Sequence, residues 1–241
     1  MRQAIRRDGR VRRVAAVLAV VAGLALTGCT TLTTSGPATP SPSAPTVRAQ
    51  PTAAAIGDSI AIGWGVPADD AWPLIAATRL GWDLTDLGEG GAGFTKPGVN
   101  THDFDDQVSA AIRLRPQVVI VAATRNDSAT AAAAPATVKR DTVAAIDRLS
   151  TALPRTTIVG MGSVWGATAA DRTATVIDEA LKSAVLAVGG HWLPLGQPFL
   201  GKPTLMQSDG IHPTSAGQSL LGRTVADAIA KARIEPGPAR G

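Results

Sequence analysis

Three polar residues of this chain have the types and spacing needed for catalysis by an activated serine. Ser59 follows a short apolar run that ends at Ile56, where a strand would release its hydroxyl into a cleft. Asp209 and His212 are three residues apart, so one turn can bring the carboxylate beside the imidazole. The aspartate would then accept one ring N–H and leave the other nitrogen to take the serine proton. Taken singly, such a serine is also typical of a helix cap. The Asp–His pair is also typical of the start of a helix that bears a surface histidine.

Two further segments could stabilise negative charge. The segment 87–94 is rich in glycine, which lets the backbone approach a ligand closely. Asn126 and Asp127 follow the apolar run 117–123, and the Asn amide is a hydrogen-bond donor. Each segment alone is equally typical of a turn, so only their combination with Ser59 and His212 indicates a site.

Alternating patterns predict the elements that position these residues. Short apolar runs alternate with segments of helical periodicity, which favours a parallel sheet with helices on both faces. Expected strands are 53–56, 83–87, 117–123, 156–161 and 191–195, and expected helices are 69–80, 104–114, 136–153, 172–188 and 214–232. The third run is apolar without alternation, as in a central strand. Since ligand sites form beyond the carboxyl ends of such strands, the loops after residues 56, 87 and 123 should meet there.

Together these segments resemble the four signature blocks of the SGNH (GDSL-like) serine hydrolases, in the family's order. Gly57-Asp58-Ser59 is similar to the first block, Leu87 to Phe94 to the second, Thr124-Arg125-Asn126-Asp127 to the third, and Asp209 to His212 to the last. The resemblance covers residues 53–232. One position departs from it, because Thr124 stands where the third block has glycine and adds a β-carbon near the expected cleft.

The resemblance implies an α/β fold, a flavodoxin-like three-layer α/β/α sandwich with a five-stranded parallel sheet, and a carboxylic-ester hydrolase that works through an acyl-enzyme. Ser59 would be the nucleophile, His212 the base and then the acid, and Asp209 the residue that orients it. The oxyanion hole would consist of the backbone N–H groups of Ser59 and Gly91 and the Asn126 amide. The register of the glycine segment also allows Gly90 or Gly93 in place of Gly91.

Two other functions remain open at this stage. The same triad serves an acyltransferase that passes the acyl group to a glycan hydroxyl, and the fold also suits a non-catalytic envelope lipoprotein that binds a glycan or a protein. The ester itself, whether an acylated glycan, an acyl lipid, a thioester or an aryl ester, is not specified by these residues. With three histidines, one cysteine and no paired ligand spacing, we expect no metal site. We also expect no cofactor and a monomer.

The first 28 residues are typical of a bacterial lipoprotein signal peptide. Six arginines among the first thirteen residues precede the apolar run 14–26, which is too short to span a bilayer comfortably. Leu26-Thr27-Gly28-Cys29 resembles a lipobox, so we expect Cys29 to be lipidated and to anchor the protein to the membrane. The alternative is ordinary secretory cleavage with an incidental cysteine, which would leave the protein secreted.

The remaining sequence predicts a tether and a single domain. Residues 29–52 are rich in Pro, Ser and Thr and lack the apolar surface for a core, and the hydrolase domain is expected at 53–241. Beyond the arginine-rich segment, residues 14–241 have a net charge of −1. This balance excludes a basic nucleic-acid-binding domain. The signal peptide and Cys29 predict the outer face of a bacterial cell membrane as the location.

Overall fold

A computed structural model of the protein describes residues 49–239. The predicted signal peptide, Cys29 and the tether as far as residue 48 lie outside the described residues. The main elements are β1 (Thr52–Ile56), α1 (Trp72–Leu80), β2 (Asp83–Asp86), α2 (Phe104–Leu114), β3 (Val118–Ala122), α3 (Ser128–Ala133), α4 (Pro135–Ala152), β4 (Thr157–Met161), α5 (Arg172–Ala187), β5 (His191–Leu193) and α6 (Ser215–Ala232). Short 3-10 helices lie at Ala68–Asp70, Arg125–Asp127 and Pro203–Leu205.

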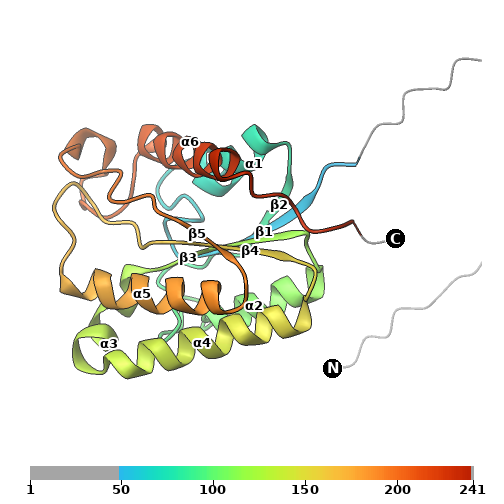
Figure 1. The fold of residues 1–241 in the computed structure, drawn as a ribbon. Helices are drawn as coiled ribbons and strands as arrows, with labels where there is room; N and C mark the ends of the chain where they lie inside the picture. Colours follow the sequence, from blue (N-terminus) through green and yellow to red (C-terminus); the bar gives the residue numbers. More distant parts are fainter. Residues whose placement is uncertain (1–48, 240–241) are drawn as a thin grey trace, which may run out of the picture. The chain divides into compact units, whose positions relative to one another are not determined.

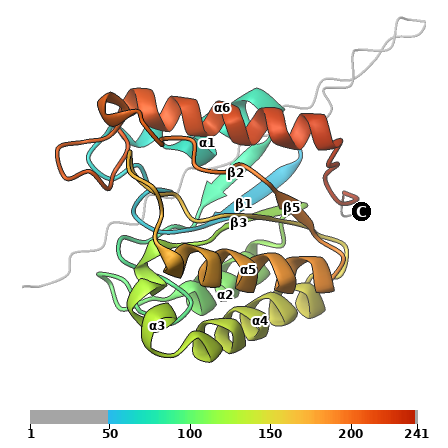
Figure 2. The same ribbon diagram turned by 60° about the vertical axis from the view of Figure 1, so that its left-hand side comes forward.

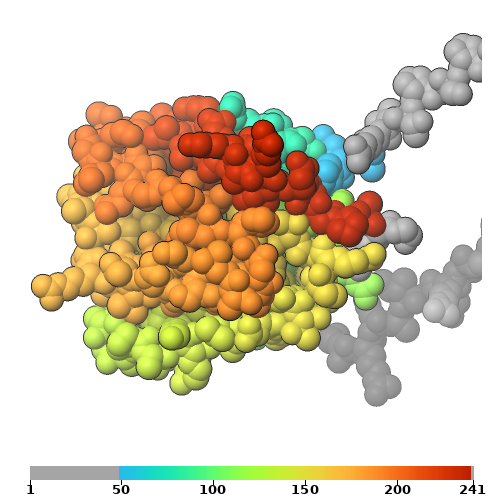
Figure 3. All heavy atoms as spheres, viewed as in Figure 1, coloured from blue at the N-terminus to red at the C-terminus, as the bar shows by residue number. Residues whose placement is uncertain are grey.

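The five strands form one parallel sheet in the order β2-β1-β3-β4-β5. Helices α1 and α6 cover one face, and α2, α3, α4 and α5 cover the other (Figure 1, Figure 2). In the space-filling view α6 (red) forms the upper edge and α3 and α4 (green to yellow) the lower edge (Figure 3). The predicted three-layer α/β fold is therefore confirmed. Chain order reverses between β1 and β3, where open α/β sheets place their ligands.

The sheet separates two apolar cores. All five residues of β3 are buried, because helices cover both of its faces. Val119 and Val121 point into the core that contains Phe104 of α2, whereas Val118 and Ile120 point into the core under α1 and α6. Successive side chains of β3 thus pack into opposite cores, which holds the strand in place together with the loop that follows it.

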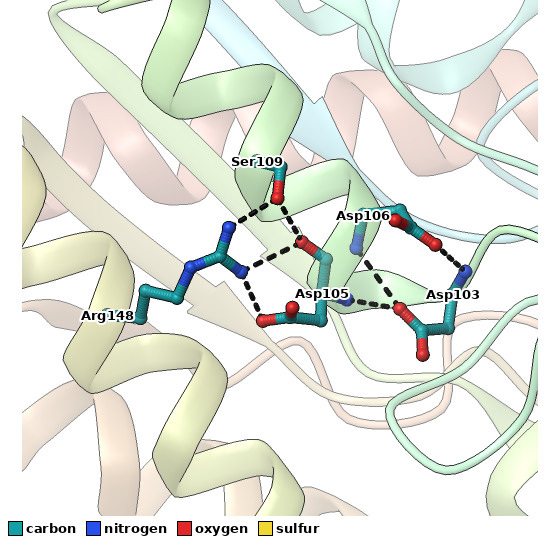
Figure 4. A network of polar contacts seen from close by, with 5 residues as sticks. All are labelled: Asp103, Asp105, Asp106, Ser109 and Arg148. Atoms are coloured by element: carbon teal, nitrogen blue, oxygen red, sulfur yellow. Dashed lines mark hydrogen bonds and ion pairs between the residues drawn. The ribbon is translucent and has the colours of Figure 1, made fainter.

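Polar contacts fix the start of α2 and join it to α4 (Figure 4). The Asp103 carboxylate accepts the N–H groups of Asp105 and Asp106, and the Asp106 side chain accepts the Asp103 N–H, which completes a capping box. Arg148 of α4 donates to the Asp105 carboxylate and to the Ser109 hydroxyl. Helix α2 begins and ends at the predicted residues. The capping box accounts for its start, and at its end Arg115 adopts left-handed backbone with φ 54°.

Two helical segments differ from the prediction. The expected helix 69–80 is divided, because Ala71 has extended backbone between the 3-10 helix and α1. The expected helix 136–153 is preceded by an additional helix, α3, which we did not predict. Ala134 separates α3 from α4 with φ −148° and ψ 68°, since a residue before proline, here Pro135, avoids helical backbone.

The helices of the domain are short for a membrane span. The longest helices, α4 and α6, have 18 residues each. Neither they nor any other helix within residues 49–239 combines the length and the apolar character that crossing a membrane requires.

Candidate active site

A cleft of ≈ 340 Å³ opens at the carboxyl ends of β1 and β3. It is lined by Ser59, Trp64, Gly90, Gly91, Val99, Arg125, Asn126, Ile211 and His212. The structure thus brings together four of the predicted site residues, Ser59, Gly91, Asn126 and His212, from four separate segments. Asp209 does not line the cleft and contacts His212 on the side away from Ser59.

Ser59, His212 and Asp209 form a continuous chain of hydrogen bonds. The Ser59 Oγ lies 2.9 Å from His212 Nε2, and His212 Nδ1 lies 2.6 Å from Asp209 Oδ2. With the ring proton on Nδ1, the imidazole donates to the carboxylate and leaves Nε2 to accept from the serine hydroxyl. These are the contacts that a serine needs in order to lose its proton to a base during attack.

Asp209 is exposed, and hydrogen bonds hold it further in its charged form. Hydrogen bonds from the His212 ring, then from the backbone N–H groups of His212 and Ile211, lower the pKa of Asp209 to about 2. Its side chain is 41% exposed and that of His212 only 15%. A carboxylate that stays ionised at neutral pH favours the imidazolium formed when His212 takes a proton.

The loop that bears His212 is attached to the nucleophile loop through Gln207. The Gln207 backbone N–H donates to the His212 carbonyl over 2.7 Å. Its side-chain amide donates to the carbonyls of Trp64, over 2.6 Å, and Pro213, over 3.0 Å. Gln207, which sequence reasoning did not select, thus connects the loop of the base to the loop of the nucleophile.

Two buried glutamines hold the nucleophile turn from opposite helical layers. Gln107 of α2 exchanges two hydrogen bonds of 2.9 Å with the backbone of Gly57. Gln218 of α6 donates to the Ile60 carbonyl and accepts the N–H of Trp72, the first residue of α1. Buried polar groups are costly unless they are paired, so these complete pairings fix the turn around Ser59. Sequence reasoning missed both residues.

The predicted oxyanion donors differ in whether they already bind a protein acceptor. Within residues 49–239, the backbone N–H groups of Ser59 and Gly91 donate to no protein acceptor. Gly91 has φ +80°, a conformation that favours glycine. The Asn126 amide donates to the Ala92 carbonyl over 2.9 Å and, at the longer distance of 3.5 Å, to Asp58 Oδ2. Gly93 is excluded as the alternative donor, because its N–H donates to Lys96 and it does not line the cleft.

Asp127 connects the glycine-rich loop to the end of β3 through hydrogen bonds. Its buried carboxylate accepts the N–H groups of Phe94 and Thr95 and the Thr95 hydroxyl, over 2.7 to 3.0 Å. A β-carbon at Gly93 would lie 2.5 Å from Asp127 Oδ1, so only glycine fits there. The second and third blocks are thus one unit, although we assigned Asp127 no role from the sequence.

Glu89 binds the part of the loop that leads to α2. Its carboxylate accepts the Asn100 N–H over 2.7 Å and lies 3.0 Å from His102 Nδ1. Burial raises the pKa of Glu89, but these hydrogen bonds outweigh burial and the net pKa lies below the ordinary value. The Val99 N–H donates to the Gly90 carbonyl, so this arrangement brings Val99 to the cleft.

Apolar side chains surround the mouth of the cleft. Trp64, Val99 and Ile211 are 53%, 71% and 36% exposed, and the Trp64 ring centroid lies 6.2 Å from that of His212. Arg125 also lines the cleft, with its guanidinium 4.9 Å from the ring centroid of Trp165. Among the described residues, no group of three or more His, Cys, Asp or Glu side chains is placed to hold a metal ion.

Comparisons with known proteins agree on one family. The model of the GDSL-like lipase/acylhydrolase family matches residues 55–220. A GDSL lipase of Mycobacterium tuberculosis, Rv0518, is 24% identical over 168 residues, which are 66% of this chain and 69% of that protein.

Solved structures share the fold at low sequence identity. The psychrotrophic esterase EstA from Pseudoalteromonas sp., inhibited by monoethylphosphonate, has a TM-score of 0.62 and 16% identity over 77% of this chain and all of that chain. The salicylyl-acyltransferase SsfX3 from a tetracycline biosynthetic pathway has a TM-score of 0.59 and 18% identity over 80% of this chain and 57% of that chain.

Proposed function

We propose, from the premise that this chain belongs to the GDSL-like lipase/acylhydrolase family, that it hydrolyses carboxylic esters through an acyl-enzyme on Ser59. The observation that carries the proposal is the 2.9 Å contact between Ser59 Oγ and His212 Nε2 inside the cleft. The bond from His212 Nδ1 to Asp209 supports it, because it leaves Nε2 free to act as a base.

The geometry supports a two-step reaction. Ser59 Oγ attacks the ester carbonyl carbon while its proton passes to His212 Nε2, and the alcohol then leaves with that proton. Water attacks the acyl-enzyme in the second step, giving one proton to His212, and Ser59 recovers that proton as the acid departs. In both steps the N–H groups of Ser59 and Gly91 and the second N–H of Asn126 would stabilise the negative oxygen.

The lining supports an ester that has an apolar group on at least one side of the carbonyl, in the acyl part or in the alcohol part. Trp64, Val99 and Ile211 would contact whichever part of the ester extends from Ser59 toward the mouth. Acylated glycans, acyl lipids, thioesters and aryl esters all have an apolar group in the acyl part or in the alcohol (or thiol) part. A panel that varies acyl length on one alcohol and the alcohol on one acyl group would identify which end these side chains bind.

The test compares the purified full chain with Ser59→Ala and with a control, Ser183→Ala, at an exposed serine of α5. The wild type and the control should release nitrophenol from short-chain acyl esters, and Ser59→Ala should not. Equal activity in all three proteins would remove Ser59 from the mechanism.

Acyl transfer is the second candidate, supported by the fold shared with the salicylyl-acyltransferase. The open cleft would admit an acceptor alcohol in place of water after the acyl-enzyme has formed. Adding glycan or simple alcohol acceptors distinguishes the two: new esters with suppressed free acid indicate a transferase, and unchanged acid release indicates a hydrolase.

A non-catalytic envelope lipoprotein is the alternative from a different class. It would retain ligand binding while Ser59 failed to react with a fluorophosphonate. Location is a separate proposal, which rests on the sequence of residues 1–52 alone: an exported protein attached through Cys29 to the outer face of the membrane. Labelling of the wild type but not of Cys29→Ser by a fatty-acid analogue in cells would support the anchor.

A further inference from the structure

Thr124 occupies the position at which the third block has glycine, and its side chain does not enter the cleft. The residue follows β3, is 1% exposed and caps the 3-10 helix Arg125–Asp127. Its hydroxyl donates to Asp58 Oδ2 over 2.5 Å and accepts the Asn126 backbone N–H over 3.1 Å. The extra β-carbon expected from the sequence therefore brings a hydroxyl that joins the loop after β1 to the loop after β3.

Asp58 is a buried carboxylate that requires donors. Its Oδ1 accepts the Ile60 N–H over 2.9 Å, and its Oδ2 accepts the Thr124 hydroxyl. Burial raises the pKa of Asp58, and the hydrogen bonds from Thr124 and Ile60 and the charge of His212 act against that rise. If the hydroxyl were absent, Oδ2 would bind the next available donor, because an unpaired buried carboxylate is costly.

That next donor is the Asn126 amide. Its Nδ2 lies 3.5 Å from Asp58 Oδ2, too far for a strong bond, while one of its N–H groups is used on the Ala92 carbonyl. The remaining N–H can therefore point either to Asp58 or to an oxyanion above Ser59. An amide drawn toward Asp58 would lose its role as an oxyanion donor.

We propose that Thr124 is a positioning residue that satisfies Asp58 Oδ2 and so keeps the second N–H of Asn126 available for the oxyanion. The inference rests on the proposed function and adds to it a residue that replaces the block's glycine. It predicts that the hydroxyl matters for the rate of the chemical step and that its effect passes through Asn126.

The test measures kcat, KM and the rate of fluorophosphonate inactivation for the full chain. Thr124→Val keeps the shape of the side chain and removes the hydroxyl, so kcat and the inactivation rate should fall about 10- to 100-fold with KM nearly unchanged. Thr124→Ser keeps the hydroxyl and should stay within about three-fold of wild type. Thermal unfolding of each variant shows whether it is folded, and Thr124→Ala replaces the valine variant should that fail to fold.

A double-mutant cycle separates positioning from general loosening of the fold. In an Asn126→Ala background, Thr124→Val should cost less than about two-fold, because the group it acts through is already gone. An equal loss in both backgrounds, or a valine variant as fast as wild type, would overturn the proposal. Failure of the proposed function is distinguishable, since wild-type Ser59 would then not react with the probe at all, and that outcome removes both inferences.

Discussion

The loop after β1 and the segment before α6 each place an aspartate near the reacting atoms, and the two differ in almost every respect. Asp58 is the sequence neighbour of Ser59, but its buried carboxylate binds Ile60 and Thr124. Asp209 is remote in sequence and 41% exposed, but it bonds directly to His212. Burial raises the pKa of Asp58, whereas hydrogen bonds lower that of Asp209 to about 2. Proximity to the nucleophile along the chain thus does not determine which carboxylate supports the base. The three-residue turn from Asp209 to His212 and the hydrogen bond between them do.

Removing the residue that connects Asp209 to Ser59 should have the largest effect. His212→Ala leaves the serine without a base, and we expect kcat for ester hydrolysis to fall by about 10⁴- to 10⁶-fold. His191→Gln, at an exposed histidine of β5, is the matched control and should retain activity. Comparable losses in the two variants would mean that His212 has no special role.

Neutralising the exposed carboxylate should have the next largest effect. In Asp209→Asn the amide no longer favours the imidazolium or the required tautomer, and kcat should fall about 10²- to 10⁴-fold. Asp141→Asn on α4, where the side chain pairs with its exposed neighbour Arg140, is the control. If Asp209→Asn keeps full activity over the whole pH range, Asp209 does not orient the base.

The oxyanion donor should contribute less than the triad. Asn126→Ala removes one of three predicted donors, so kcat should fall about 10²- to 10³-fold with a smaller change in KM. Asn100→Ala is the control, because only the backbone of Asn100 contacts Glu89. A loss confined to KM would indicate that Asn126 binds the ground state and not the transition state.

The smallest effects concern stability, and their pH dependence has opposite signs for the partly buried Asp86 and the exposed Asp209. Burial raises the pKa of Asp86 on β2 to about 6, above its unfolded value of 3.8, so its ionisation destabilises the fold as pH rises from about 4 to 7. Asp86→Asn removes this cost, and its stability relative to wild type should increase over that range by up to roughly 3 kcal/mol.

Asp209 should behave in the reverse manner, because its pKa is lowered. Its contribution to stability is present above pH 3.8 and is lost as pH falls toward 2. Asp209→Asn should therefore differ from wild type at pH 6 and approach it in strong acid. Denaturant unfolding at several pH values checks both variants, with Asp83→Asn on the exposed start of β2 as control. Parallel pH profiles for Asp86→Asn and Asp209→Asn would contradict the comparison.

The fold and the family were predictable because their signals are local. The apolar run of β3 and the capping box of α2 lie within a few residues each, and the four blocks occur in the family's order. Both predictions are confirmed. The roles of Ser59, Asp209 and His212 stay predictions, although the structure brings the three side chains into contact.

What could not be predicted depends on pairing between distant elements. Gln107 and Gln218 lie within the apolar stripes of their helices, and a buried polar residue in such a stripe is the one sequence signal that could have identified them. Their partners, Gly57 and Ile60, cannot be read from the helices alone. From the sequence, Thr124 was only a departure from the glycine of the third block. Its role could not be predicted, because its hydrogen-bond partner Asp58 is 66 residues away.

The central claim is that Ser59 is the activated nucleophile, and covalent labelling tests it most directly. The full chain would be treated with a fluorophosphonate, and the modified peptide would be identified by mass spectrometry. The account predicts an adduct on Ser59 in the wild type, no adduct in Ser59→Ala and much slower labelling in His212→Ala. An unlabelled wild type, or an adduct that persists in Ser59→Ala, would contradict it.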